Sequence, residues 1–150
     1  MEIERKFLIN EENWKKLKKP EPVSIKQGYI SVNPNCTVRV RTKGKKGFMT
    51  IKGMTVGISR EEFEYEIPIQ EAEKMLSLFA DKRILKDRYE IKVKGKTWEV
   101  DVFLDALAPL ILAEIELESE DEIVEKPNWV GKEVSDDPEY YNSNLIHRIS

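Results

Sequence analysis

The sequence predicts an α+β fold in which most of the chain forms antiparallel β-strands, with a few short helices between them. Short runs of alternating apolar and polar residues recur along the whole chain, which is the pattern of half-buried strands. Turn residues separate these runs at the short spacing of β-hairpins. Because the 150 residues contain no internal repeat and no linker rich in glycine, serine or proline, we expect one domain over residues 1–150.

The predicted strands follow one another in a regular series. They cover residues 2–9, 24–32, 37–42, 48–52, 60–69, 83–94, 97–105 and 110–118. The connection from Gly44 to Gly47 is typical of a hairpin, since glycine supplies the positive φ angles that such turns need. We therefore expect strands 37–42 and 48–52 to pair, and a second turn at Gly95-Lys96 to join two later strands.

Four helices are predicted between or after the strands. They cover residues 11–19, 70–79, 119–125 and 138–148. Pro20 and Pro22 end the first of them, because proline cannot continue a helix. The second carries apolar residues at helical spacing. The third is predicted from a capping box between Ser119 and Glu122.

Each strand separates charged from apolar side chains when it is sorted into its two faces. Residues two apart share a face, so Glu2, Glu4 and Lys6 lie opposite Ile3 and Phe7 in the first strand. Later strands repeat this plan. The charged set is Glu2, Glu4, Lys6, Arg39, Arg41, Lys52, Glu62, Glu64, Lys86, Arg88, Asp101, Glu114 and Glu116.

Two arrangements fit this pattern. Solvent can simply wet the charged face, as in many antiparallel sheets. Against this, the face holds few of the Ser, Thr and Gln residues of a wet strand, and same-sign doublets such as Arg39 and Arg41 repel unless opposite charge or a ligand lies between them. Alternatively, the sheet closes into a barrel whose charged face lines the lumen and whose apolar face packs outwards against helices. Such a lumen would enclose a charged ligand.

The charges suit a divalent metal together with a polyanion. Mg²⁺ and Mn²⁺ prefer oxygen ligands. Carboxylates are available from Glu2, Glu4, Glu62, Glu64, Asp101, Glu114 and Glu116. Phosphate oxygens can be bound by Lys6, Arg39, Arg41, Lys52, Lys86 and Arg88. Since the chain has no glycine-rich phosphate loop, we expect side chains to bind the phosphates.

Composition argues against several other classes of protein. The apolar run over residues 106–113 is far shorter than the roughly 20 residues of a membrane span, so we expect no membrane association. Acidic residues directly follow Met1, so we expect no leader sequence and a cytoplasmic location. Cys36 and His147 are the only residues of their kinds, which argues against a zinc cluster of cysteines and a histidine-based nucleophilic site. We expect Cys36 in the core. At a net charge of −3 we expect no nucleic-acid partner.

A series of motifs resembles the CYTH superfamily, also called triphosphate tunnel metalloenzymes. The first is Glu-x-Glu-x-Lys, formed by Glu2, Glu4 and Lys6. The others, in chain order, are Gln27-Gly28-Tyr29, Arg39-x-Arg41, Lys52, Ser59-Arg60 with Glu62-x-Glu64, Lys86-x-Arg88-Tyr89, Asp101-Val102-Phe103, Glu114-x-Glu116 and Gly131-Lys132-Glu133-Val134. The resemblance implies an eight-stranded antiparallel β-barrel, the triphosphate tunnel, with a charged lumen and short flanking helices.

The resemblance also implies a divalent-metal-dependent hydrolase of linear triphosphates. The form of the Gln27-Gly28-Tyr29 motif is similar to that of small bacterial members, for which inorganic triphosphate is the usual substrate. We therefore expect hydrolysis of inorganic triphosphate to pyrophosphate and phosphate, with side activity on nucleoside triphosphates. Adenylate cyclase or thiamine triphosphatase activity on the same fold, or a non-catalytic polyphosphate-binding module, are the alternatives, and a homodimer is possible.

The resemblance implies roles for the charged residues. One Mg²⁺ or Mn²⁺ would be held by Glu2, Glu4 and Glu116, and a second by carboxylates among Glu62, Glu64, Asp101 and Glu114. The residues expected to act in catalysis are Glu2, Glu4, Lys6, Lys52, Glu62 and Glu64. Those expected to bind substrate are Lys6, Arg39, Arg41, Lys52, Lys86, Arg88 and Lys132. Lys132 is included because several relatives have a basic residue in the last helix where this chain has Asn144.

Overall fold

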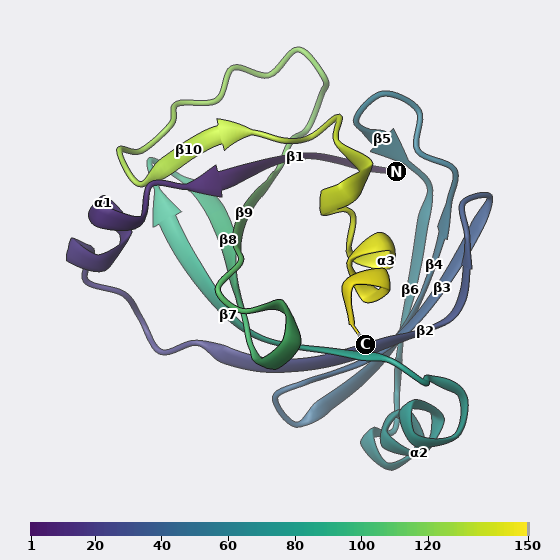
Figure 1. Cartoon of the computed structure of the whole chain (residues 1–150). Coiled ribbons are helices and arrows are strands. Elements are labelled where there is room, and N and C mark those ends of the chain that lie inside the picture. The colour runs from purple at the N-terminus through teal and green to yellow at the C-terminus, as the bar shows by residue number, and fades with distance from the viewer. Residues whose placement is uncertain (150) are drawn as a thin grey trace.

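The computed structural model describes residues 1–149, and their strands wrap into a ring (Figure 1). The strands run antiparallel in the order β10-β1-β9-β8-β7-β2-β3-β4-β6, and β5 pairs with β1. They are β1 (Glu2–Ile9), β2 (Val23–Asn33), β3 (Cys36–Lys43), β4 (Lys46–Gly53), β5 (Ser59–Arg60), β6 (Glu62–Ile67), β7 (Arg83–Val93), β8 (Lys96–Phe103), β9 (Ile111–Glu116) and β10 (Val130–Glu133). The predicted antiparallel pairing of sequential hairpins is thus confirmed for β3 with β4 and for β7 with β8.

The helices are short and lie between the strands or after them. They are α1 (Glu11–Lys16), α2 (Ile69–Phe79), α3 (Asn142–Leu145) and the single 3₁₀ turns η1 (Asp105–Leu107), η2 (Pro138–Tyr140) and η3 (Ile146–Arg148). In the described part of the chain, no helix is long and apolar enough to cross a membrane.

The ring is less regular than the eight-stranded closed barrel expected from the sequence. The described residues form ten strands, because Glu61 divides the strand predicted at 60–69 and β10 was not predicted. The ordered path ends at β10 and β6, so no continuous ladder closes the ring. Its gap is bridged where β5 pairs with β1, through Glu2 opposite Arg60 and Ile3 opposite Ser59. The strand changes partner at Glu61 from β1 to β4, which bends it away from a regular ladder.

The charged face of the sheet lies inside the ring and the apolar face outside. Lys86, Asp101 and Arg39 are 0, 1 and 6% exposed, so the alternative of a solvent-wetted charged face is wrong. Outside β1, β7, β8 and β9, an apolar cluster forms around Trp129, which contacts Trp98 edge to face and Trp14 in a tilted arrangement. The long segment between β9 and β10 contributes Trp129 to this cluster and so covers that wall.

Helix α2 covers one end of the wall formed by β2, β3 and β4. Its residues Ala72 and Leu76 are buried against Val40. Two glycines permit this close approach: a Cβ on Gly28 would lie 2.5 Å from the Cβ of Ala80, and one on Gly47 would lie 2.7 Å from the Cβ of Ala72. The apolar spacing that predicted this helix is confirmed.

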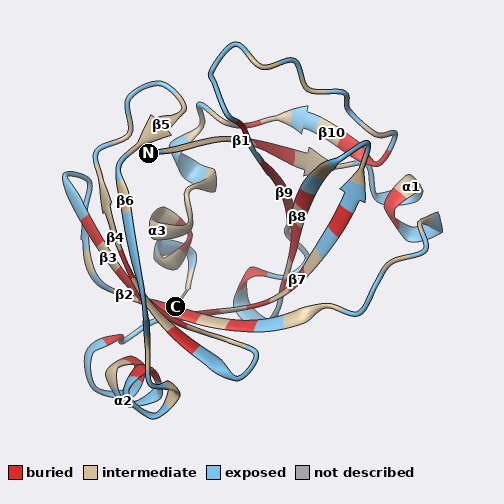
Figure 2. Ribbon diagram, turned by 180° about the vertical axis from the view of Figure 1, so that it is seen from behind, coloured by how far each residue is buried: buried red, intermediate tan, exposed pale blue. Residues whose placement is uncertain are grey.

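The segment from Pro138 to Arg148 packs inside the ring, as both views show for α3 (Figures 1 and 2). Leu145 of α3 is fully buried against Ile84, Phe103 and Leu112, which line the inner face of the sheet. The single helix predicted at 138–148 is instead divided into η2, α3 and η3. This apolar plug fills one end of the lumen and leaves the other end polar.

Other local predictions were wrong. The first helix ends at Lys16 rather than at residue 19. Residues 119–125 form no helix, and the Glu122 carboxylate accepts the N–H of Glu118 at 2.8 Å rather than that of Ser119. Cys36 is exposed, since it lies at the very start of β3 opposite Gly53, beyond the reach of α2.

Candidate functional site

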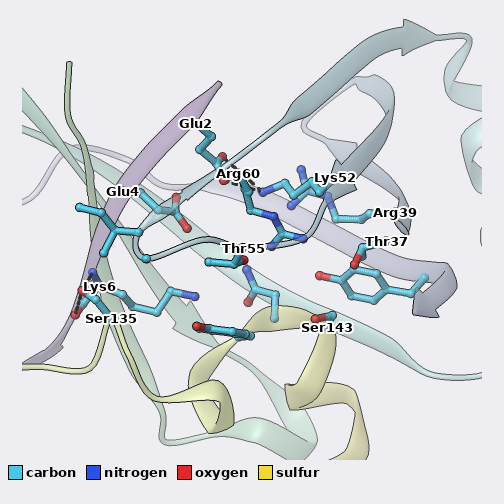
Figure 3. Close-up of a pocket in the computed structure, with 15 residues that line it drawn as sticks. Glu2, Glu4, Lys6, Thr37, Arg39, Lys52, Thr55, Arg60, Ser135 and Ser143 are labelled. Carbon is cyan, nitrogen blue, oxygen red and sulfur yellow. Dashed lines mark hydrogen bonds and ion pairs between the residues drawn. The ribbon is translucent and has the colours of Figure 1, made fainter. Parts of the chain in front are cut away.

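The polar end of the lumen forms a cavity where both ends of the chain meet (Figure 3). Strands β1 to β5 and the C-terminal segment supply its walls. Its lining comprises Glu2, Glu4, Lys6, Tyr29, Thr37, Arg39, Lys52, Thr55, Gly57, Ile58, Arg60, Ser135, Tyr141, Asn142 and Ser143. Figure 3 shows the carboxylates of β1 on one side of this cavity and basic groups of β3, β4 and β5 facing them.

The cations near Glu2 and Glu4 do not compensate for the burial of these two carboxylates and for their mutual repulsion. Burial raises the pKa of Glu4 well above its ordinary value, and the charges of Glu114 and Glu2 raise it further. Burial also raises the pKa of Glu2, although Lys52 donates to both of its oxygens at 3.2 and 3.3 Å. The nearby carboxyl of Glu62 adds to this increase. The β1 edge of the cavity therefore favours an added cation.

Lys6 of β1 contacts both β9 and the C-terminal segment. Its ammonium lies 3.6 Å from Glu114 and donates to the backbone oxygen of Tyr140 at 3.0 Å. Burial would raise the pKa of Glu114, but Lys6 and more distant cations bring it to about 2. Since Tyr141 also lies 5.9 Å from the Lys6 ammonium, the C-terminal segment shares this cation with the site.

Asp101 holds two buried cations together. It accepts from Lys86 Nζ at 2.7 Å and from Arg88 Nε and a terminal nitrogen of Arg88 at 2.8 and 3.0 Å. Although burial acts to raise it, the pKa of Asp101 lies well below its ordinary value because of these two neighbours. Both of its oxygens are thus occupied, so the structure places Asp101 with the basic pair.

Arg39 and Arg41 lie on the β3 wall, held by one carboxylate. Oε2 of Glu64 lies 3.6 Å from Arg39, 3.3 Å from Arg41 and 2.9 Å from the hydroxyl of Thr50. Burial, followed by the charges of Arg39 and Arg88, lowers the pKa of Arg41 to about 10. One shared carboxylate leaves this wall with excess positive charge.

Several guanidinium groups of the lumen keep a donor without a partner. The Nε–H groups of Arg39, Arg41 and Arg60 are buried and make no hydrogen bond in the described part of the chain. A buried donor without an acceptor costs free energy, of order 1–3 kcal/mol each. Three such donors around one lumen are chemically suited to the oxygens of a polyanion.

Five predicted site residues line the cavity, namely Glu2, Glu4, Lys6, Arg39 and Lys52. Ion pairs link seven more to them or to one another, namely Arg41, Glu62, Glu64, Lys86, Arg88, Asp101 and Glu114. The other two, Lys132 and Glu116, lie apart from these contacts. Lys132 is exposed and lines a separate hollow formed by residues 132–138. Glu116 lies directly opposite Glu4 in the sheet, but it is exposed and does not line the cavity. Lys52 does lie in the site, within 4.0 Å of Glu62.

The structure also brings in residues that had no predicted role. Glu99 accepts from Arg88 at 3.1 Å, and its position two residues before Asp101 placed it on the same face. Tyr29 and Arg60 line the cavity, and both were part of motifs to which no site role was given. Ser135 lines it too and accepts the Lys6 N–H at 2.9 Å, a role that no local sequence pattern marks.

The carboxylates fit a divalent metal by their chemistry. Among the described residues, no three His, Cys, Asp or Glu side chains already converge on one point. The raised pKa values of Glu2 and Glu4 nevertheless identify carboxylates that a nearby cation would stabilise. Asp101, whose oxygens are fully used, does not belong to this set.

Comparison with known proteins agrees with the geometry of the lumen. The model of the CYTH domain matches residues 1–148. The chain belongs to the CYTH domain family. It is 46% identical to an inorganic triphosphatase of Acetivibrio thermocellus, over 97% of this chain and 92% of that protein. It is 36% identical to an inorganic triphosphatase of Nitrosomonas europaea, over 99% and 98% of the two chains.

A solved CYTH-type structure shows the same fold. The crystal structure of the inorganic triphosphatase NE1496 matches with a TM-score of 0.67 and 34% identity, and the match covers 96% of each chain. The CYTH resemblance of the motifs is thus confirmed, and so is the predicted tunnel fold apart from its incomplete closure.

Proposed function

We propose that this CYTH protein is a divalent-metal-dependent hydrolase of linear triphosphates that converts inorganic triphosphate to pyrophosphate and phosphate. The observation that carries the proposal is the set of buried guanidinium donors without partners, on Arg39, Arg41 and Arg60. They surround the same lumen as the cation-poor carboxylates of Glu2 and Glu4. A polyanion together with a metal would satisfy both groups. The names of the relatives at 46 and 36% identity support this substrate.

The carboxylates of β1 would hold the metal. Glu2 and Glu4 are the first ligands. Further donors are Glu116, on the neighbouring strand β9, and Glu62 of β6, whose carboxyl lies near that of Glu2. Mg²⁺ or Mn²⁺ bound there would neutralise phosphate oxygens and lower the pKa of a bound water. A second ion would need a carboxylate with an oxygen that no Lys or Arg already occupies. This favours Glu62 and Glu64 over Asp101.

The basic residues would bind and orient the phosphate chain. Arg39 and Arg60 present their free donors from β3 and β5, and Lys52 and Lys6 reach the same cavity. Lys86 and Arg88 lie deeper and are positioned by Asp101. These cations would stabilise the charge of the transferred phosphoryl group without having to rearrange, because neighbouring carboxylates already fix them.

The proposal is tested by phosphate release from inorganic triphosphate, ATP, thiamine triphosphate and pyrophosphate, with Mg²⁺, with Mn²⁺ and with chelator. The protein should carry no N-terminal tag, because Glu2 lines the cavity. We expect metal-dependent release that is fastest from inorganic triphosphate, and a loss of roughly 10²-fold or more in kcat/KM for Arg39→Ala.

The other outcomes separate the alternatives. Cyclic AMP formed from ATP would identify a cyclase, and faster release from thiamine triphosphate would identify that substrate. Tight binding of triphosphate without release under any metal would refute hydrolysis and identify a binding module. Lys82→Ala is a matched control, because Lys82 is an exposed lysine that does not line the cavity.

A further inference from the structure

Gln27 is a polar residue that β2 buries completely on the lumen side of the sheet. Its side chain shares a face with Tyr29, which lines the cavity. It is 0% exposed, and neither its Nε2 nor its Oε1 has a hydrogen-bond partner in the described part of the chain. Nearly all buried polar groups in folded proteins are hydrogen-bonded, because a buried amide without partners costs free energy. Packing alone therefore does not account for the carboxamide of Gln27.

The neighbours of Gln27 on the adjoining strands are one cation and one apolar residue. Arg41 of β3 lies directly opposite Gln27 on one side, and Ile84 of β7 lies opposite it on the other. Opposite residues in an antiparallel pair share a face, and their Cβ atoms lie roughly 5 Å apart. The Nε–H of Arg41 is also buried without a partner among the described residues. Gln27 and Arg41 thus form a pair of unsatisfied side chains on two paired strands.

The two polar groups of a carboxamide suit a terminal phosphate. The amide nitrogen donates and the amide oxygen accepts. A terminal phosphate can carry a proton near neutral pH, so it presents acceptor oxygens together with one hydroxyl donor. An internal phosphate of the chain presents only acceptors, which lysine and arginine bind more strongly. A methionine would fill nearly the same space without polar atoms, so the packing beside Ile25 and Ile84 does not require glutamine at this position.

The register places Gln27 one step beyond the cavity. Tyr29 and Arg39 lie opposite each other and both line the cavity, and Gln27 and Arg41 are the next opposite pair on the same face. Two residues of a strand span about 7 Å. This distance is comparable to the length of a linear triphosphate, so a chain with one end among the cations of the cavity brings its other end to Gln27. Pyrophosphate is shorter by one phosphate and ends before it.

We propose that Gln27 binds the terminal phosphate of a linear triphosphate and so selects a chain of three phosphates over a chain of two. Its Nε2 and the Nε–H of Arg41 donate to oxygens of that phosphate, and its Oε1 accepts from the phosphate hydroxyl. The other end of the chain lies beside Lys6, Arg39 and Lys52 in the cavity. This role rests on the proposed function, because it belongs to the same triphosphate site.

The experiment compares Gln27→Met with Gln70→Met. Gln70 is the other glutamine of the chain and is exposed on α2, so its variant is a matched control that should behave like the wild type. Steady-state hydrolysis with Mg²⁺ gives kcat/KM for inorganic triphosphate and the inhibition constant of added pyrophosphate. We expect Gln27→Met to lower kcat/KM roughly tenfold or more, the effect of losing one hydrogen bond to a charged group, and to leave inhibition by pyrophosphate unchanged. Because the substitution removes an unsatisfied buried amide, it should also raise the Tm of the ligand-free protein.

Two results would overturn the proposal. One is an unchanged kcat/KM in Gln27→Met. The other is an equal weakening of triphosphate and pyrophosphate together with a lower Tm, which would identify Gln27 as a purely structural residue. If Gln27→Met does not fold, Gln27→Glu takes its place, because Arg41 lies opposite and compensates for the new charge. This carboxylate repels the terminal phosphate, so the variant should weaken triphosphate and spare pyrophosphate in the same way.

Failure of this proposal is distinguishable from failure of the proposed function. A wild type that releases no phosphate from triphosphate would refute hydrolysis. Calorimetric titration with triphosphate and with pyrophosphate then makes the same comparison between Gln27→Met and the wild type, because no turnover disturbs the binding. A wild type that hydrolyses triphosphate while Gln27→Met does so equally well would refute only the role of Gln27.

Discussion

Lys86 and Asp101 form an ion pair of 2.7 Å whose side chains are 0 and 1% exposed. Arg88 binds the same carboxylate through two nitrogens. Burial lowers the pKa of Lys86 to about 8 even though Asp101 acts to raise it. The carboxylate is therefore what keeps two desolvated cations in the wall of the lumen, and its role is to position them.

Replacing Asp101 by Ala should destabilise the protein strongly. Removal of one partner from a buried ion pair leaves uncompensated charge and typically costs about 3–5 kcal/mol. Urea unfolding followed by circular dichroism measures this loss. Asp87→Ala is the control, because Asp87 is a neighbouring aspartate of β7 that makes no side-chain ion pair or hydrogen bond in the described residues. Equal stability of the two variants would contradict the positioning role.

Glu4→Gln should make the metal-free protein more stable at neutral pH. The pKa of Glu4 is raised in the folded state, so its contribution is favourable below the pKa of the unfolded chain and is lost as pH rises through the folded pKa. Ionisation of the carboxylate therefore opposes folding, and the neutral amide removes this penalty. Thermal unfolding with chelator should show a higher Tm than in the wild type. A lower Tm would show that the carboxylate stabilises the fold.

The affinity for Mg²⁺ or Mn²⁺ should rise with pH. A metal binds the deprotonated carboxylates, and the pKa values of Glu2 and Glu4 are both raised, so protons compete at higher pH than for ordinary glutamates. Calorimetric titration at a series of pH values measures the affinity and the protons released. With Glu4→Gln the binding should be weaker and its dependence on pH shallower. Affinity that is constant from pH 5 to 8 would count against these ligands.

Gly28→Ala should destabilise the contact between α2 and the sheet. The added Cβ would lie 2.5 Å from the Cβ of Ala80 and 3.1 Å from Leu76, so the helix must shift. Overpacking of this kind typically costs about 1–3 kcal/mol. The combined variant Gly28→Ala, Ala80→Gly should recover part of the loss in urea unfolding. Gly95→Ala does not serve as the control, because Gly95 has a φ of +81°.

Alternation along the strands was sufficient to predict which residues share the lumen. A residue's face in a strand depends only on whether its position is odd or even, so a local pattern determines it. Lys6, Arg39 and Lys86 were assigned in this way and are all buried inside the ring. The same parity places Glu99, two residues before Asp101, on the lumen face, although the predicted charged set did not include it.

What the sequence could not predict depends on contacts between distant segments. Asp101 was grouped with the metal ligands because its carboxylate chemistry is the same, and only three-dimensional distances show that it contacts Lys86 and Arg88. Lys132 was chosen from a resemblance and lies outside the cavity. The division of the last helix and the partner change at Glu61 depend likewise on packing inside the ring.

The position of β1 determines the order in which the site can form during folding. This first strand pairs with β5, β9 and β10, through partners such as Arg60, Glu114 and Glu133 that lie far along the chain. Ladders with such large sequence separation close late, because the entropy of a long loop must first be lost. Hairpins such as β3 with β4 can form earlier, but they contain only part of the site. We therefore expect bound triphosphate to slow unfolding while leaving the refolding rate nearly unchanged.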